Sequence, residues 1–128
     1  MTTTIHRSVV RHVAVLVLLA CTSASAQHEY DQWFFGEYAG LDFRSGRPVP
    51  VSGSPVVTEE GTAAYSDSET GELLFYTDGR TIWSRDHRPM AYGSGLKGGI
   101  SSAQSALIIP WPACDPDDRR FFVFTADN

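Results

Sequence analysis

The sequence predicts an all-β fold, an antiparallel meander of short strands, on two observations. After residue 26, no window repeats apolar residues at helical three-four spacing over three turns. Short runs of β-favouring residues alternate instead with turn formers such as Ser45-Gly46, Asp67–Gly71 and Asp78-Gly79. Because tight turns join strands that neighbour each other in the chain, this pattern favours an antiparallel meander over a parallel sheet.

The expected strands follow from these runs in chain order. Two aromatic runs flank a glycine-containing bend near the start of the domain, and a proline-rich segment, residues 48–55, is kept out of any central strand because proline lacks a backbone donor. The glycine-rich segment Gly93–Gly99 is expected to be a flexible surface loop. The strands are expected at residues 33–35, 41–43, 62–65, 72–77, 81–84, 105–109 and 120–125.

The residues of two turns indicate how each turn is formed. Asp67 can fold its side chain onto the backbone and Gly71 can take a positive φ, so a tight turn is expected there. Asp78-Gly79 between two β-rich runs is a strong hairpin signal, because a type I′ turn requires positive φ at both central residues. Together these turns predict a three-stranded unit over residues 62–83.

The first 26 residues have the layout of a secretory signal peptide. Arg7 and Arg11 precede an apolar run, residues 13–20, that is too short to span a bilayer. Small residues then lead to Ala26 and Gln27. We expect cleavage between these two residues, which leaves residues 27–128 as the domain.

Lipidation at Cys21 is the alternative. Leu18-Leu19-Ala20-Cys21 resembles a bacterial lipobox, in which the cysteine is acylated and becomes the mature N-terminus. Cleavage after Ala26 would instead remove Cys21 and leave Cys114 without an intramolecular partner in this stretch. The protein is therefore expected to be secreted or on the outer cell surface, and the alternative is a lipoprotein anchored through Cys21.

The charge of the mature chain limits its partners. Removing residues 1–26 leaves 8 basic against 15 acidic residues, so the formal charge becomes −7 instead of −5. This excess of acid argues against nucleic acid and anionic membranes as partners. A hydrophobic content of 42% argues against disorder, and no apolar stretch is long enough for a transmembrane segment.

The last strand suggests that the domain is larger than this stretch. Phe121–Phe124 is a continuous apolar run, which is typical of a strand buried on both faces. A propeller blade is a four-stranded sheet, so 102 residues supply about two blades where a ring needs roughly four to eight. We expect the first one to two blades of a β-propeller-like fold, an incomplete fragment that packs against the rest of its own chain beyond Asn128.

Several segments together carry a family resemblance. They are Trp33–Gly36, Ala39–Phe43, Glu60–Ala63, Ser66-Asp67, Gly71–Gly79, Thr81–Trp83, Met90, Gly93, Gly95-Leu96, Ser101–Ala106 and Phe121–Thr125. In this order they resemble the secreted, WD40-like β-propeller proteins of Bacteroidetes that often end in a type IX secretion or gliding-motility-associated sorting domain. The resemblance implies an exported protein at the cell surface.

The segment around the Asp-Gly hairpin resembles a second known element. Asp78–Trp83 is similar to the Asp box of sialidase-type propellers, with glycine directly after the aspartate and one extra residue before the tryptophan. An Asp box is a structural turn. We therefore assign Asp78, Gly79 and Trp83 to hairpin stabilisation and not to ligand contact.

No pattern in the sequence predicts a catalytic or metal centre. His28 and His87 lack ligand-spaced partners, and Gly93-Ser94-Gly95 lacks the nucleophile elbow of serine hydrolases. Ser101–Ser105 is polar enough to line a pocket, but we favour a loop. Acidic residues in loops suit calcium, yet no calcium-loop order is present, so we expect no cofactor and keep calcium as the alternative. Those residues are Glu59, Glu60, Asp67, Glu69, Asp115, Asp117 and Asp118.

The sequence therefore predicts a binding protein. Trp33, Trp83 and Trp111 could form a sugar-stacking platform, although such residues more often fill a small β core. We expect an exported binding or scaffolding module for protein or glycan, without catalytic activity of its own. The alternative is the N-terminal part of an extracellular glycan-active propeller enzyme whose catalytic residues lie beyond Asn128.

Overall fold

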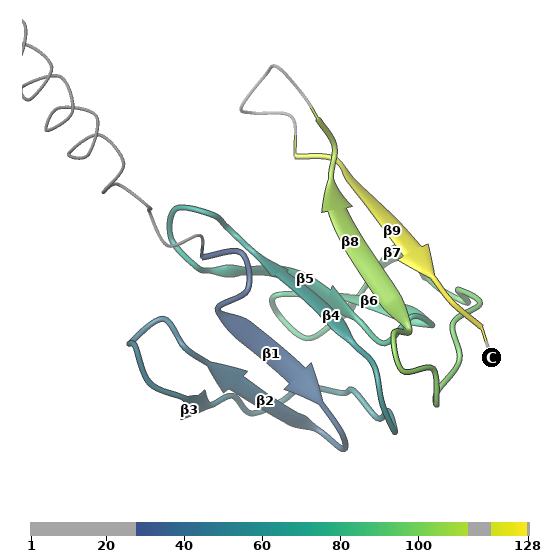
Figure 1. Ribbon diagram of the computed structural model, residues 1–128, viewed down its shortest axis with the longest axis horizontal. Helices are drawn as coiled ribbons and strands as arrows, with labels where there is room; N and C mark the ends of the chain where they lie inside the picture. The colour runs from purple at the N-terminus through teal and green to yellow at the C-terminus, as the bar shows by residue number, and fades with distance from the viewer. Residues whose placement is uncertain (1–27, 113–118, 128) are drawn as a thin grey trace, which may run out of the picture.

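The computed structural model describes residues 28–112 and 119–127. Cys21, Ala26, Gln27, Cys114 and the acidic residues at 115–118 lie outside this part of the chain. Within it the fold is all-β and antiparallel, as predicted, with nine strands in three sheets (Figure 1). No helix in the described ranges is long and apolar enough to cross a membrane.

The three sheets follow each other along the chain, and within each sheet the strands pair in chain order. The first contains β1 (Gln32–Phe35), β2 (Ala39–Asp42) and β3 (Val49–Pro50). The second contains β4 (Ala63–Ser66), β5 (Leu73–Thr77), β6 (Thr81–Ser84) and β7 (Pro89–Ser94). The third pairs β8 (Ala106–Pro110) with β9 (Phe121–Thr125).

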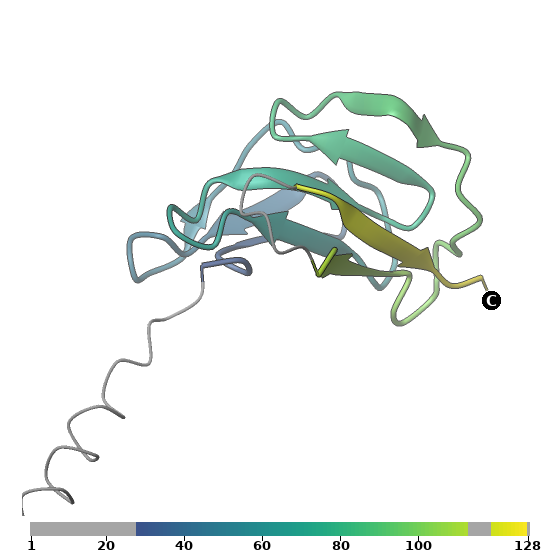
Figure 2. The same cartoon turned by 90° about the horizontal axis from the view of Figure 1, so that it is seen from above.

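The four-stranded sheet has one strand more than predicted. The sequence predicted a unit that ended at Trp83, but β7 pairs with β6 as an edge strand (Figure 2). Its residues are exposed except for Gly93, so no apolar alternation marks it in the sequence. Pro89 is tolerated because it lies at the sheet edge, and Tyr92 has φ 59° where the register shifts. The predicted glycine loop consequently begins at Gly95 and not at Gly93.

The turn between β4 and β5 forms as predicted. Asp67 Oδ1 accepts hydrogen bonds from the backbone N–H groups of Glu69 and Thr70, at 3.1 and 3.0 Å. Gly71 has φ 69°, the left-handed conformation that glycine adopts without strain. The side chain of Asp67 thus closes the turn, and Gly71 redirects the chain into β5.

The turn between β5 and β6 is not the predicted type I′. Gly79 has φ 86°, but Asp78 keeps an ordinary negative φ, so only one central residue is left-handed. Asp78 Oδ1 accepts hydrogen bonds from the backbone N–H groups of Arg80 and Thr81, both at 2.8 Å. Because the aspartate side chain satisfies these donors, the three-residue connection is held without a second left-handed residue. Asp78 and Gly79 therefore serve as the predicted structural turn by a different geometry.

An aromatic cluster joins the first sheet to the second. The rings of Phe34 and Tyr76 stack with their centroids 4.0 Å apart, and the rings of Tyr76 and Trp83 are 5.5 Å apart. All three residues are buried, together with Val56 and Leu73. The Tyr76 hydroxyl and His87 Nδ1 are hydrogen-bonded at 2.7 Å. This cluster, which we call the aromatic core, fixes β1 against β5 and β6.

One face of β9 is half-buried against the other sheets, and its other face is exposed. The expected burial of both faces depends on chain beyond Asn128 and stays a prediction. Phe121 and Val123 pack against a second cluster of Tyr65, Phe75 and Ile108. The alternate residues Phe122 and Phe124 are 42% and 54% exposed. A continuous apolar run in the sequence does not distinguish these faces, because the side chains of a strand alternate between them.

Gly79 is also a point of close approach between segments, which gives a stability prediction. A Cβ atom at Gly79 would lie 2.6 Å from the backbone oxygen of Ser105, whereas one at Gly95 would have no heavy atom within 4 Å. Both glycines have positive φ, so Gly79→Ala and Gly95→Ala each carry a left-handed cost of about 1–2 kcal/mol.

We expect Gly79→Ala to lower the free energy of unfolding clearly more than Gly95→Ala, because only the first variant adds a steric collision. Urea denaturation followed by tryptophan fluorescence measures both. Equal losses would show that Ser105 does not approach Gly79.

Candidate binding pocket

A pocket lies where the three sheets meet. The strand β4 packs against both β1 and β8, and the space beside these strands has a volume of about 420 Å³. Such a volume falls within the roughly 300–1,000 Å³ typical of small-ligand sites. Its lining is mainly apolar and is supplied by Tyr30, Gln32, Trp33, Phe34, Phe35, Thr62, Ala63, Ala64, Gln104, Ala106, Leu107 and Ile108.

The alternation of β1 places aromatic rings at this pocket. Phe34 points into the aromatic core, so Trp33 and Phe35 on the opposite face stay 54% and 42% exposed. The Trp33 ring is nevertheless held, because its Nε1–H donates a hydrogen bond to the backbone oxygen of Tyr30 at 2.9 Å. The ring also contacts Phe43, with 4.8 Å between centroids. Trp33 therefore presents a fixed, exposed aromatic surface.

The polar side chains of the lining differ in whether they are already hydrogen-bonded within the protein. Thr62 Oγ1 donates a hydrogen bond to the backbone oxygen of Phe34, and Gln32 Nε2 donates one to the backbone oxygen of Gly71 at 3.4 Å. Gln104 is exposed and has no partner among the described residues. Its amide is thus free to hydrogen-bond a ligand.

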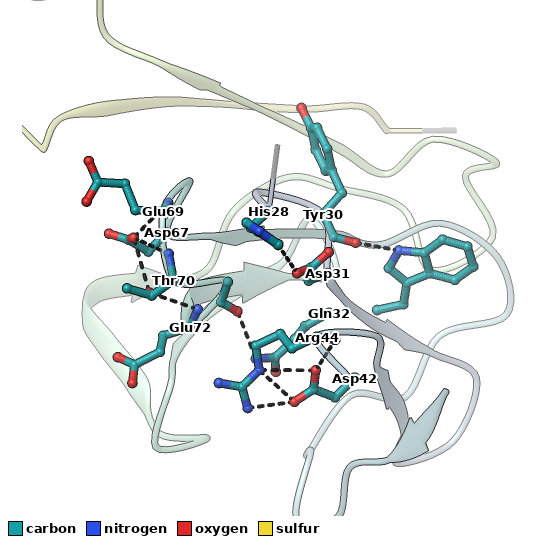
Figure 3. A network of polar contacts seen from close by, with 12 residues as sticks. His28, Tyr30, Asp31, Gln32, Asp42, Arg44, Asp67, Glu69, Thr70 and Glu72 are labelled. Atoms are coloured by element: carbon teal, nitrogen blue, oxygen red, sulfur yellow. Dashed lines mark hydrogen bonds and ion pairs between the residues drawn. The ribbon is translucent and has the colours of Figure 1, made fainter. Parts of the chain in front are cut away.

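A polar network beside the pocket fixes the segment that leads into β1 (Figure 3). His28 Nδ1 and Asp31 Oδ2 are 2.6 Å apart, and the guanidinium of Arg44 binds the Asp42 carboxylate with Nη2 2.6 Å from Oδ2. The hydrogen bonds from Arg44 lower the pKa of Asp42 below its ordinary value. In the adjacent turn, the backbone N–H groups of Thr70 and then Glu69 lower the pKa of Asp67.

Arg44 also lines a second pocket of about 290 Å³, together with Glu72, Arg85, Asp86 and His87. We assign the network a structural role because its charged groups pair with each other. His28 belongs to it, and His87 belongs to the aromatic core. Within the described ranges, no three His, Cys, Asp or Glu residues are grouped so that they could hold a metal ion.

The serine-rich segment forms a loop, as the sequence analysis favoured, and its last residue is structural. Ser105 is fully buried, and its Oγ donates a hydrogen bond to the backbone oxygen of Gly61 at 2.5 Å. The pocket instead takes Gln104 from this loop. The sequence analysis gave a pocket lining as the alternative for this segment, but nothing in the sequence distinguishes Gln104 from its polar neighbours.

The three tryptophans do not form one platform. Trp83 is buried in the aromatic core, where it supports the hairpin as predicted, and Trp33 lies at the pocket. Trp111 follows β8, with its ring 4.9 Å from that of Phe122 and the guanidinium carbon of Arg120 4.8 Å from its centroid. Only Trp33 combines exposure with a place in the pocket lining.

Comparison of the chain with models of known protein families, with curated proteins and with solved structures finds no match. The resemblance to Bacteroidetes propeller proteins, and the type IX secretion route that it implies, therefore stay predictions from the sequence.

Proposed function

We propose that this chain is an exported binding module that works at the cell surface or outside the cell. The observation that carries the proposal is the fixed, exposed ring of Trp33 at an apolar pocket. Exposed aromatic rings in concave sites contribute strongly to recognition, because a fixed ring loses little conformational freedom on binding.

The pocket chemistry supports binding without catalysis. The lining contains no Asp, Glu, His, Lys or Arg among the described residues. Glycoside hydrolysis usually requires two carboxyl groups across the bond to be broken, and this lining supplies none; the phenol of Tyr30 is its one titratable side chain among the described residues. The residues present can hold a ligand through apolar contact and an amide.

A β-propeller-like arrangement remains our proposal for the architecture. The β4–β7 meander has the strand number of one blade. The first strands of the three sheets, β1, β4 and β8, pack side by side, as the inner strands of successive blades would. In this arrangement the pocket would lie near the axis of the ring, where propellers commonly present their ligand sites.

Export is supported by the charged, apolar and small-residue order of residues 1–26. When the full chain is expressed in a Gram-negative host, we expect the exported protein to begin at Gln27. Mass spectrometry of the intact protein measures its N-terminus. An exported protein that retains Met1 would contradict cleavage, and palmitate labelling that Cys21→Ser abolishes would establish the lipoprotein instead.

The binding function is tested by incubating the purified, exported chain with arrays of oligosaccharides and of peptides. We expect specific binding to members of at least one array, with loss of the signal in Trp33→Ala because the pocket loses its main aromatic surface. The matched control is Trp111→Ala, which removes an exposed tryptophan outside the pocket and should bind as the wild type does. Absence of binding to both arrays would contradict the proposed function.

A further inference from the structure

The shape and anchoring of Trp33 point to a particular class of ligand. One face of a pyranose ring is a flat array of C–H groups, while its edge carries hydroxyl groups. Such a ring stacks on an indole when the indole is exposed and held in place. Trp33 meets both conditions, because it is 54% exposed and is fixed through Tyr30 and Phe43.

The polar groups of the pocket fit the edge of a sugar. The Gln104 amide offers two N–H donors and a carbonyl acceptor, which can serve two neighbouring hydroxyl groups at once. Tyr30 adds a phenolic hydroxyl, and its ring is positioned by an edge-on contact with Tyr65, with centroids 6.2 Å apart. A neutral ligand with several hydroxyl groups satisfies these side chains.

The uncharged lining of the pocket limits the class of ligand further. Since no Asp, Glu, His, Lys or Arg among the described residues lines it, a charged ligand would lose its hydration without gaining an ion pair. An aromatic peptide side chain could occupy the apolar part, but its ring offers the Gln104 amide fewer hydrogen-bonding groups than the hydroxyl-bearing edge of a sugar does. The uncommitted amide therefore favours a sugar over a peptide.

We propose that this pocket binds a neutral oligosaccharide, with one pyranose ring stacked on Trp33 and with hydroxyl groups of the oligosaccharide bonded to Gln104 and Tyr30. The inference rests on the proposed binding function and specifies the ligand class at the same site.

Calorimetric titration of the full chain with cellopentaose, maltopentaose and chitopentaose tests the inference, with an uncharged tryptophan-containing tripeptide as the competing probe. We expect at least one oligosaccharide to bind and the tripeptide not to bind. Trp33→Ala should weaken sugar binding at least tenfold, Trp33→Phe should weaken it less, and Gln104→Ala should weaken it several-fold. Trp111→Ala should leave sugar affinity unchanged.

The outcomes separate this inference from the broader proposal. Binding of the tripeptide alone, with the loss in Trp33→Ala, would overturn the sugar assignment and leave a peptide-binding module. Sugar binding that is unchanged in both Trp33→Ala and Gln104→Ala would show that the sugar binds elsewhere and not in this pocket. If none of the four probes binds, the sugar assignment is overturned. The oligosaccharide and peptide arrays described above then test whether the chain is a binding module at all. Because Gln104 is exposed and unpaired, its alanine variant tests the site even if Trp33→Ala fails to fold.

Discussion

The stack of Phe34, Tyr76 and Trp83 is the interaction on which the rest of the structure depends. It is formed by one residue from each of β1, β5 and β6, so it joins two sheets that share no backbone ladder. Burial raises the pKa of the Tyr76 hydroxyl, which stays protonated and hydrogen-bonded to His87. Because Phe34 is held in this core, its neighbour Trp33 must face outward at the pocket. The binding surface is thus a consequence of how the first sheet is anchored.

Close backbone packing positions the third sheet, which contains β8 and β9. The Gly98 N–H donates a hydrogen bond to the Gly79 oxygen at 3.0 Å, and the Ala126 N–H donates one to the Ser105 oxygen at 3.1 Å. A side chain at Gly79 would collide with the backbone of Ser105, and one at Gly98 would collide with the backbone of Gly79. The loop before β8 therefore lies directly against the β5–β6 turn, which brings β8 beside β4. Together with the aromatic core, this approach makes a pocket from three segments that are far apart in the sequence.

The sequence predicted the features that local chemistry determines. Asp67 and Gly71 marked a turn, and Asp78 and Gly79 marked a hairpin. The all-β fold followed from short β-favouring runs between turn formers and from the lack of helical spacing. Features that depend on tertiary contacts were not predicted. The strand β7 was missed because both its faces are largely exposed, so it has no apolar pattern. A continuous apolar run likewise does not tell the exposed face of β9 from its half-buried face. Trp33 was among the predicted aromatic candidates, but only the packing of β1 separates it from Trp83. Gln104 could not be identified as a pocket residue from the sequence, because only the folded loop places it there.

The central claim is that the aromatic core and the contacts of Ser105 make the three sheets one cooperative unit. Native-state hydrogen–deuterium exchange, measured strand by strand in low concentrations of urea, tests this claim most directly. The account predicts that the slowest-exchanging amides of β1, β4 and β8 converge on the same free energy of opening. If the first sheet opened at a clearly lower free energy than the β4–β7 sheet, β1 would not be held by the core, and the pocket beside it would not be a stable part of the fold.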